Sequence, residues 1–316
     1  MKNQTTNILI LISLLALAAC SAPPANLDHD DGKLNVVATT TFVGETVQII
    51  GGDDIALTFL LSPGENPHTY EPTPRDMTTL ANADIIFING LGLEVFIDDM
   101  LENVSDQTEI LSVSDGIITR EIGEKHDGDD DHDDDDGETH GTQDPHVWMS
   151  PRNIMQWANN IANALSRLDE DHADQYRANA EAYLIELEAL DSWVGEQMAQ
   201  IPEENRVLVS DHLSFGYLAD DYGLEQIGAV IPALTTEAAP SGQALAELQD
   251  LIREHNVQAI FVSFDFDPSI AERVAEDTGT ALINLYLGSL TPAGGPADTY
   301  IRFTHYNADA IVKALK

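Results

Sequence analysis

The sequence predicts an α/β protein of two lobes, each a parallel sheet flanked by helices, joined by one long rigid helix. Three observations support this fold class. Strand-like and helix-like runs alternate in both halves of the chain, which is typical of parallel α/β architecture. A long helical block separates the halves. The chain has 316 residues, 43% of them hydrophobic, which suggests two domains with ordinary cores.

The N-terminal α/β lobe is predicted over residues 33–120. Short runs rich in β-branched and other apolar residues predict strands over Asn35–Ala38, Ile55–Leu60, Asp84–Asn89 and Glu109–Val113. The intervening segments predict helices over Val43–Ile50, Arg75–Ala83 and Glu94–Val104.

The C-terminal α/β lobe is predicted over residues 202–316 and repeats the plan. Its strands are expected over Arg206–Val209, Glu225–Val230, Ala259–Phe264 and Ala281–Leu285. Its helices are expected over Phe215–Tyr222, Gln243–His255, Pro268–Thr278 and Thr299–Leu315, the first ending at Gly223.

The segment between the lobes is helical. Residues 145–170 lead into the linker and include a helix over Arg152–Leu168. The long linking helix is placed at residues 171–201, with Asp171–Gln200 as its helical run. Apolar residues recur there at steps of three or four: Tyr176, Ala180, Tyr183, Leu187, Leu190, Val194 and Ile201. A rod of that length, ~45 Å at ~1.5 Å per residue, makes a stiff joint between lobes rather than a flexible hinge.

The N-terminus predicts export. Residues 1–20 have the pattern of a signal peptide, with Lys2 before the apolar run Ile8–Ala16. The small residues 17–19 before Cys20 resemble the lipobox of bacterial lipoproteins, in which the cysteine is lipidated and becomes the first residue of the mature chain. We therefore expect an extracytoplasmic, membrane-anchored lipoprotein with residues 21–32 as a tether. The alternative is a plain signal peptide with a chance cysteine. As Cys20 is the only cysteine, no internal disulfide is possible.

The charge is strongly acidic. The chain has 55 acidic and 14 basic residues, a formal net charge of -41, which disfavours nucleic acid and anionic membrane surfaces as partners. Cations are the natural partners of such a field, although solubility or adaptation to salt explains most of the charge. Residues 121–144 form an acidic loop whose stretch Glu124–His140 contains His126, His132 and His140 and is expected to be disordered. It is either a solvated spacer or a weak, fast-exchanging metal collector.

Three histidines occupy comparable places. His68 lies in "LSPGENPHTYEPTPRDM", a loop stiffened by four prolines that follows a predicted strand. His146 lies in "DPHVWMSP", and His212 follows a strand in "VLVSDHLSFGYL". Ligands of parallel sheets bind at the carboxyl ends of strands, so these imidazoles are predicted to converge on a cleft between the lobes. Each alone is also compatible with an incidental surface histidine. Their separations, 78 and 66 residues, exclude a local zinc finger.

The histidine stretches, together with "IFVSFDFDPSIAERVAEDTG" and "LINLYLGSL", resemble those of the zinc- and manganese-specific substrate-binding proteins of ABC importers (cluster A-I, the ZnuA/TroA-like family). The resemblance covers about Leu34 to the C-terminus. It implies two lobes with a metal held between them and His68, His146 and His212 as metal ligands. It also implies an ABC permease and its ATPase as partners. The acidic loop resembles the metal-rich loop of zinc-uptake members.

The chain departs from the family pattern at the fourth ligand. Many members have a carboxylate at the end of the last strand, where this chain has Leu285, and an acid where it has Ser263. Water is the simplest fourth ligand, and Asp265 is a second candidate because it lies just past a strand. Three histidines with one carboxylate or none favour Zn²⁺ over the harder Mn²⁺.

The function predicted is capture and delivery of Zn²⁺, or less favourably Mn²⁺, with no catalysis. Two alternatives remain: a metal-binding adhesion lipoprotein with a structural metal, and a hydrolase with a three-histidine zinc centre. The sequence has no H-E-x-x-H motif and no P-loop.

Overall fold

The computed structural model describes residues 32–101, 104–105, 107–121 and 143–316. Leu34–Lys316 forms one compact unit. The signal segment, Cys20, the tether up to residue 31 and the acidic stretch Glu124–His140 lie outside the described residues, so what the sequence predicts for them stays a prediction. In the described part of the chain, no helix combines the length and the apolar character needed to span a bilayer.

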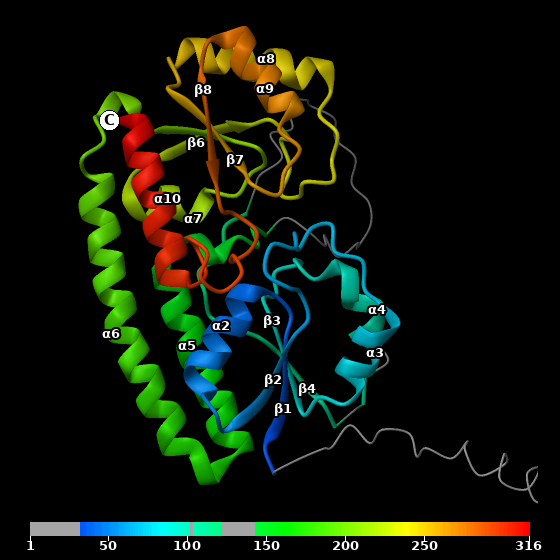
Figure 1. The fold of residues 1–316 in the computed structure, drawn as a ribbon. Helices are drawn as coiled ribbons and strands as arrows, with labels where there is room; N and C mark the ends of the chain where they lie inside the picture. The colour runs from blue at the N-terminus through cyan, green and yellow to red at the C-terminus, as the bar shows by residue number, and fades with distance from the viewer. Residues whose placement is uncertain (1–31, 102–103, 106, 122–142) are drawn as a thin grey trace, which may run out of the picture. The chain divides into compact units, whose positions relative to one another are not determined.

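The first sheet has four parallel strands in the order β2-β1-β3-β4. The strands are β1 (Leu34–Ala38), β2 (Ile55–Phe59), β3 (Ile85–Ile88) and β4 (Glu109–Ser112). The helices of this lobe are α2 (Thr41–Gly51), α3 (Pro74–Ala81) and the short α4 (Asp98–Leu101), which follows a 3₁₀ turn at Val95–Ile97. Figure 1 shows α2 on one side of the sheet and α3 and α4 on the other. The parallel lobe expected from the sequence is confirmed.

The helix expected over Glu94–Val104 is present only in part, as the 3₁₀ turn Val95–Ile97 followed by the four-residue α4 (Asp98–Leu101). Gly90, Leu91 and Gly92 all have positive φ, so the chain turns sharply after β3. The buried Glu94 carboxylate folds back onto this turn and accepts hydrogen bonds from the N–H groups of Asn89, at 2.6 Å, and Gly90, at 3.0 Å. Because Glu94 closes the turn, helical structure begins only after it.

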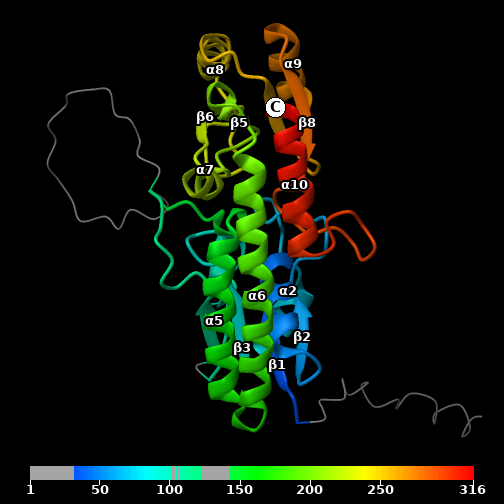
Figure 2. The ribbon, with the colours of Figure 1, turned by 90° about the vertical axis from the view of Figure 1, so that its left-hand side faces the viewer.

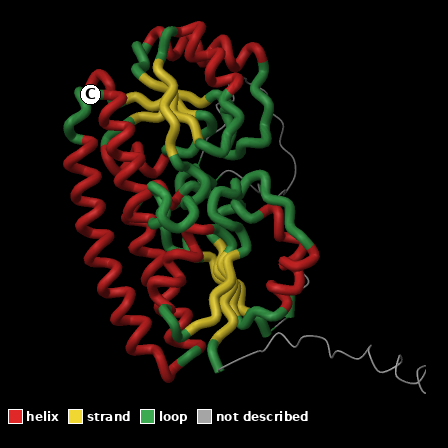
Figure 3. Tube along the Cα trace, in the orientation of Figure 1, coloured by secondary structure: helices red, strands yellow, loops and turns green. Residues whose placement is uncertain are grey.

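The second sheet repeats the topology with the strand order β6-β5-β7-β8, all parallel. Its strands are β5 (Val207–Ser210), β6 (Glu225–Ala229), β7 (Ala259–Ser263) and β8 (Ala281–Leu285). Its helices are α7 (Gly216–Tyr222), α8 (Gly242–Glu254), α9 (Ser269–Thr278) and α10 (Tyr300–Leu315). In each sheet, the second strand pairs with one edge of the first strand and the third strand pairs with its other edge. The strand order therefore reverses between β1 and β3 in the first sheet and between β5 and β7 in the second. Figure 3 shows that the region between the two sheets is filled by loops.

Two antiparallel helices pack beside the first lobe: α5 (Pro151–Leu168) and α6 (Ala173–Met198), and only α6 continues along the second lobe. With 26 residues, α6 is ~39 Å long at ~1.5 Å per residue. The stripe that it buries contains Tyr176, Ala180, Tyr183, Leu187, Leu190, Val194 and Met198. It packs against α2 of the first lobe and α10 of the second as well as against α5 (Figure 2). The rigid joining helix expected from the sequence is therefore present.

The segment between β8 and α10 fastens the lobes to each other. Hydrogen bonds from this segment and from the first residue of α10 reach the first lobe and the entry of α5. They include Leu290 N–H to Thr41 Oγ1 (2.9 Å), Tyr300 N–H to Glu45 Oε2 (2.6 Å) and Trp148 Nε1–H to Leu287 O (2.8 Å). The largest apolar core runs without interruption from the first sheet through α5, α6 and α10 to the second sheet. The two lobes are thus joined by packing as well as by chain connectivity.

Candidate metal centre

His68 lies in the loop after β2. Its backbone N–H donates to Asn66 Oδ1 at 2.9 Å, which closes a tight turn beside the buried Pro67. Asn66 Nδ2–H also donates to Thr236 Oγ1 of the second lobe, at 3.3 Å. The proline-stiffened loop thereby holds His68, whose side chain is half-buried, at the boundary between the lobes.

His146 is buried, with an exposed fraction of 1%. The Asp144 carboxylate accepts both its backbone N–H, at 3.0 Å, and its ring Nδ1–H, at 2.8 Å. Asp144 is in turn anchored through its backbone N–H to Arg120 O, and Asn89 Nδ2–H donates to Pro145 O. This segment therefore fixes the ring of His146 from its Nδ1 side and leaves Nε2 facing away.

His212 follows β5 by two residues and is also buried. The carboxylate of Asp211 accepts its backbone N–H and its Nδ1–H, both at 2.7 Å. The second oxygen of Asp211 accepts the N–H of Ser263 at the end of β7, at 2.6 Å. The arrangement repeats that of His146, since a carboxylate holds Nδ1 and Nε2 is free to bind.

The three imidazoles meet. Nε2 of His146 lies 3.1 Å from Nε2 of His68 and 3.0 Å from Nε2 of His212. One ligand atom from each histidine lies within 4.8 Å of the other two, and no other histidine or acidic residue in the described part of the chain joins this cluster. A tetrahedral zinc ion with Zn–N bonds of ~2.0–2.1 Å separates its nitrogens by ~3.3 Å, so the donor set fits an ion of this size. The convergence expected from the sequence is therefore present in the geometry.

The electrostatics favour neutral rings. Burial, with a smaller contribution from the neighbouring imidazoles, lowers the pKa of His68 well below its ordinary value. Burial also lowers the pKa of His146, although the Asp144 carboxylate opposes this shift. Both rings are therefore unprotonated at neutral pH, as a metal requires of its imidazole ligands.

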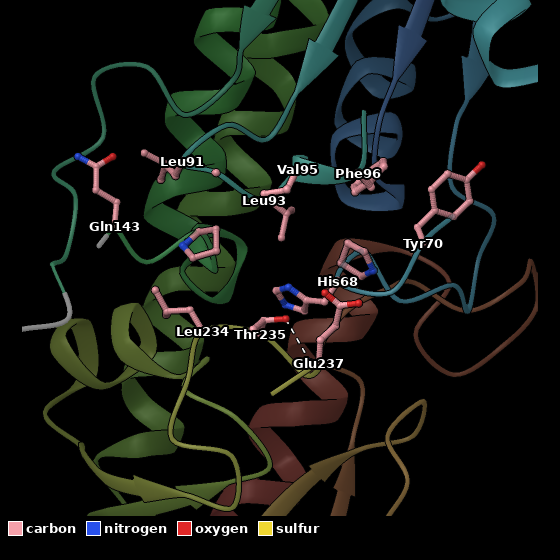
Figure 4. Close-up of a pocket in the computed structure, with 13 residues that line it drawn as sticks. His68, Tyr70, Leu91, Leu93, Val95, Phe96, Gln143, Leu234, Thr235 and Glu237 are labelled. Carbon is pink, nitrogen blue, oxygen red and sulfur yellow. Dashed lines mark hydrogen bonds between the residues drawn. The ribbon is translucent and has the colours of Figure 1, made fainter. Parts of the chain in front are cut away.

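A pocket opens beside His68, with a volume of about 420 Å³. Leu91, Leu93, Val95 and Phe96 line it from the first lobe, and Leu234, Thr235 and Glu237 line it from the second (Figure 4). Of the three histidines, only His68 lines this pocket, so it is the one that faces the space between the lobes.

The carboxylates on the histidines were not singled out by the sequence analysis. Asp144 and Asp211 stand in "DPH" and "SDH", and an acid one or two residues before each buried histidine is the signal that points to them. At the two positions where the family pattern has an acid, Leu285 is fully buried in the main core, and the hydroxyl of Ser263 donates to Asp265.

Two parallel-sheet lobes with a buried cluster of imidazoles between them define a substrate-binding protein for a metal ion. The chain belongs to the family described as zinc-uptake complex component A, periplasmic, whose model matches residues 36–314. It is therefore a metal-binding receptor of an ABC importer and not an enzyme. This confirms the family resemblance and excludes the hydrolase alternative.

Individual relatives match this chain along most or all of its length. It is 30% identical over 316 residues to the manganese-binding lipoprotein MntA of Halalkalibacterium halodurans, covering 100% of this chain and 99% of that one. It is 32% identical over 305 residues to the iron-binding protein YfeA of Yersinia pestis, covering 96% and 93%. Among solved structures, the periplasmic zinc-binding protein TroA of Treponema pallidum matches with a TM-score of 0.79 and 27% identity, covering 90% of this chain and 99% of that one.

Proposed function

We propose that this protein captures Zn²⁺ outside the cytoplasm and delivers it to the permease of an ABC importer. The observation that carries the proposal is the meeting of three Nε2 atoms from His68, His146 and His212, which we assign as the metal ligands. The donors are neutral imidazole nitrogens, and such nitrogens suit Zn²⁺ better than Mn²⁺, which prefers oxygen.

The relatives alone do not decide the metal, because their names specify manganese, iron and zinc in different cases. Manganese is therefore the second candidate, supported by the relatives that are named manganese-binding. The donor set is what separates the two candidates here, and it favours zinc.

We further propose that the protein is held at the outer face of the membrane and that its charge attracts the metal ion. Several relatives are named lipoproteins, and Cys20 stands after a signal-like segment with small residues before it, so we propose lipidation at Cys20 as the anchor to the membrane. The net charge of -41 favours the approach of cations to the protein.

The test is a competition titration of metal-free protein with Zn²⁺ and Mn²⁺ against a chromophoric chelator. His212→Ala is expected to weaken Zn²⁺ binding by at least about tenfold, since removing even an outer-shell partner of a zinc ligand costs that much. His255→Ala, at an exposed helix end, is the control and should bind as the wild type does. Equal Zn²⁺ affinity in wild type and His212→Ala would refute the ligand assignment, and tighter binding of Mn²⁺ than Zn²⁺ would refute the choice of metal.

A structural metal is the competing role. A transport receptor keeps its fold when stripped of metal and exchanges the ion, whereas a structural site unfolds when stripped. Circular dichroism before and after chelation separates the two roles, and we expect an unchanged spectrum.

A further inference from the structure

We propose that Asp265, in the loop after β7, supplies the fourth ligand of the metal as a carboxylate oxygen. This inference rests on the proposed function. The site would then have three nitrogen ligands and one oxygen ligand. The oxygen would come from the loop after β7 and not from the end of the last strand, where many family members have a carboxylate and this chain has Leu285.

The topology places Asp265 at the correct edge of the second sheet. β5 and β7 are neighbours, and the order of strand addition reverses between them. His212 stands two residues after the end of β5, and Asp265 stands two residues after the end of β7. In open parallel sheets, the crevice beyond such a pair of strand ends is where ligands bind. The two side chains thus come from the two loops that border one crevice.

A chain of hydrogen bonds connects Asp265 to the imidazole cluster. The hydroxyl of Ser263 donates to Asp265 Oδ1. The backbone N–H of the same serine donates to Asp211, whose other oxygen holds the ring of His212. Ser263 therefore positions Asp265 and the support of His212 at the same time.

Gly288 leaves room for this carboxylate. A Cβ atom at Gly288 would lie 3.2 Å from Cδ of Pro67 and 3.4 Å from Oδ2 of Asp265. The Asp265 carboxylate and the ring of Pro67 thus flank the same point, and Pro67 is the residue directly before His68. Asp265 therefore lies near the loop that contains His68, and it is linked to His212 through Ser263 and Asp211.

The charge of the site also calls for an anion. Three neutral imidazoles bring no negative charge into direct contact with a divalent ion, and the carboxylates of Asp144 and Asp211 act on it only through the rings of His146 and His212. In this structure Ser263 engages Asp265, whose oxygens are not among the atoms that lie within 4.8 Å of one another. The proposal therefore requires the exposed Asp265 side chain to leave Ser263 and turn toward the ion when the metal binds.

Glu237 is the rival donor, because it lines the pocket beside His68. It lies in the loop after β6, which is an edge strand away from the crevice between β5 and β7. We therefore favour Asp265.

The experiment compares Asp265→Asn, Glu237→Gln and the matched control Asp267→Asn. Asp267 is exposed in the same loop and accepts hydrogen bonds from Ser269 N–H and Oγ–H, which an asparagine oxygen also accepts. Zn²⁺ affinity is measured by chelator competition, and the ligand set by the visible absorption of the Co²⁺-loaded protein. Thermal unfolding of each metal-free variant verifies the fold.

We expect Asp265→Asn to lower Zn²⁺ affinity at least about tenfold and to change the Co²⁺ spectrum, with both other variants close to wild type. Wild-type affinity and spectrum in Asp265→Asn would overturn the assignment. So would a loss confined to Glu237→Gln, which would make Glu237 the ligand. In both of these cases, a loss in His212→Ala would leave the proposed function standing. If the wild type binds no Zn²⁺, the proposed function fails and this inference fails with it.

Discussion

Nδ1 of His146 donates a hydrogen bond to Oδ1 of Asp144, and the two atoms lie 2.8 Å apart. The carboxylate fixes both the orientation of the ring and its tautomer, so that the lone pair of Nε2 points into the cluster. Asp211 does the same for His212. In the proposed metal centre, these two carboxylates would support the ligands without contacting the ion.

The first prediction concerns this support. Asp144→Ala removes the acceptor of the His146 ring and is expected to lower Zn²⁺ affinity by about 10- to 100-fold, as loss of an outer-shell carboxylate does elsewhere. Chelator competition measures the change. Asp250→Ala, which alters only an exposed ion pair with Arg253 on α8, is the control. Unchanged affinity in Asp144→Ala would show that His146 is held by other contacts.

The second prediction concerns the close approach of α7 to Asp144. A Cβ at Gly216 would lie 2.6 Å from Oδ2 of Asp144 and 2.7 Å from Nε of Arg120, whose guanidinium also donates to Gly216 O. Gly216→Ala is therefore expected to lower the free energy of unfolding by about 1–3 kcal/mol, the usual cost of overpacking.

Urea denaturation of the metal-free protein gives this free energy. Gly242→Ala is the matched control, since its Cβ would meet nothing within 4 Å. An equal effect of the two substitutions would contradict the predicted clash at α7.

The third prediction concerns the pH dependence of metal binding. The pKa of His68 and that of His146 are lowered by burial, so protons compete with Zn²⁺ for these rings only below their ordinary pKa. Zn²⁺ affinity is thus expected to be nearly constant from pH 8 to about pH 6.5 and to fall only at lower pH. Competition titrations across this range measure it, and a steep loss that begins above pH 7 would contradict it.

The fourth prediction concerns Glu45, which joins α2 to the start of α10. Burial raises the pKa of Glu45 from 4.5 to about 7, with a smaller upward contribution from Asp298, against the lowering effect of the Tyr300 N–H. Between these two values the folded protein keeps a proton that the unfolded chain releases, so stability falls as pH rises from 4.5 to 7.

Glu45→Gln removes this ionisation and keeps an oxygen that accepts the Tyr300 N–H. In the metal-free protein the variant should gain stability relative to wild type as pH rises, by up to about 3 kcal/mol at pH 8. Urea denaturation at pH 5 and pH 8 measures the difference, with Glu181→Gln at an exposed position of α6 as the control. A pH-independent difference between Glu45→Gln and wild type would refute the assignment.

Most of the secondary structure was predictable because its signals are local. All eight predicted strands agree with the structure within one residue, and the helices other than the one after β3 agree within two. Apolar periodicity and the glycine and proline stops carry this information within a single segment. For instance, Gly223 and Gly279 end α7 and α9 in the left-handed conformation.

The parts that were not predictable depend on distant contacts. Glu94 accepts from Thr39, 55 residues away, and Arg120 donates to Gly216, 96 residues away. No local pattern specifies either partner. The convergence of the histidines was expected because strand ends and the family resemblance both pointed to it, whereas the roles of Asp144 and Asp211 emerge only when their oxygens are seen at Nδ1.

The fastening of the lobes by α6 and by the segment before α10 has a consequence for how occupancy is signalled. Receptors with a flexible hinge close their two lobes over a bound solute. A joint as stiff as this one permits little lobe closure. A membrane partner that distinguishes the filled from the empty receptor must then respond to small shifts of the loops that border the ion. Recognition of the loaded receptor would then depend on the loops at the rim of the cleft. There, the proposed rotation of the Asp265 side chain would be one of the few changes that distinguish the filled protein from the empty one.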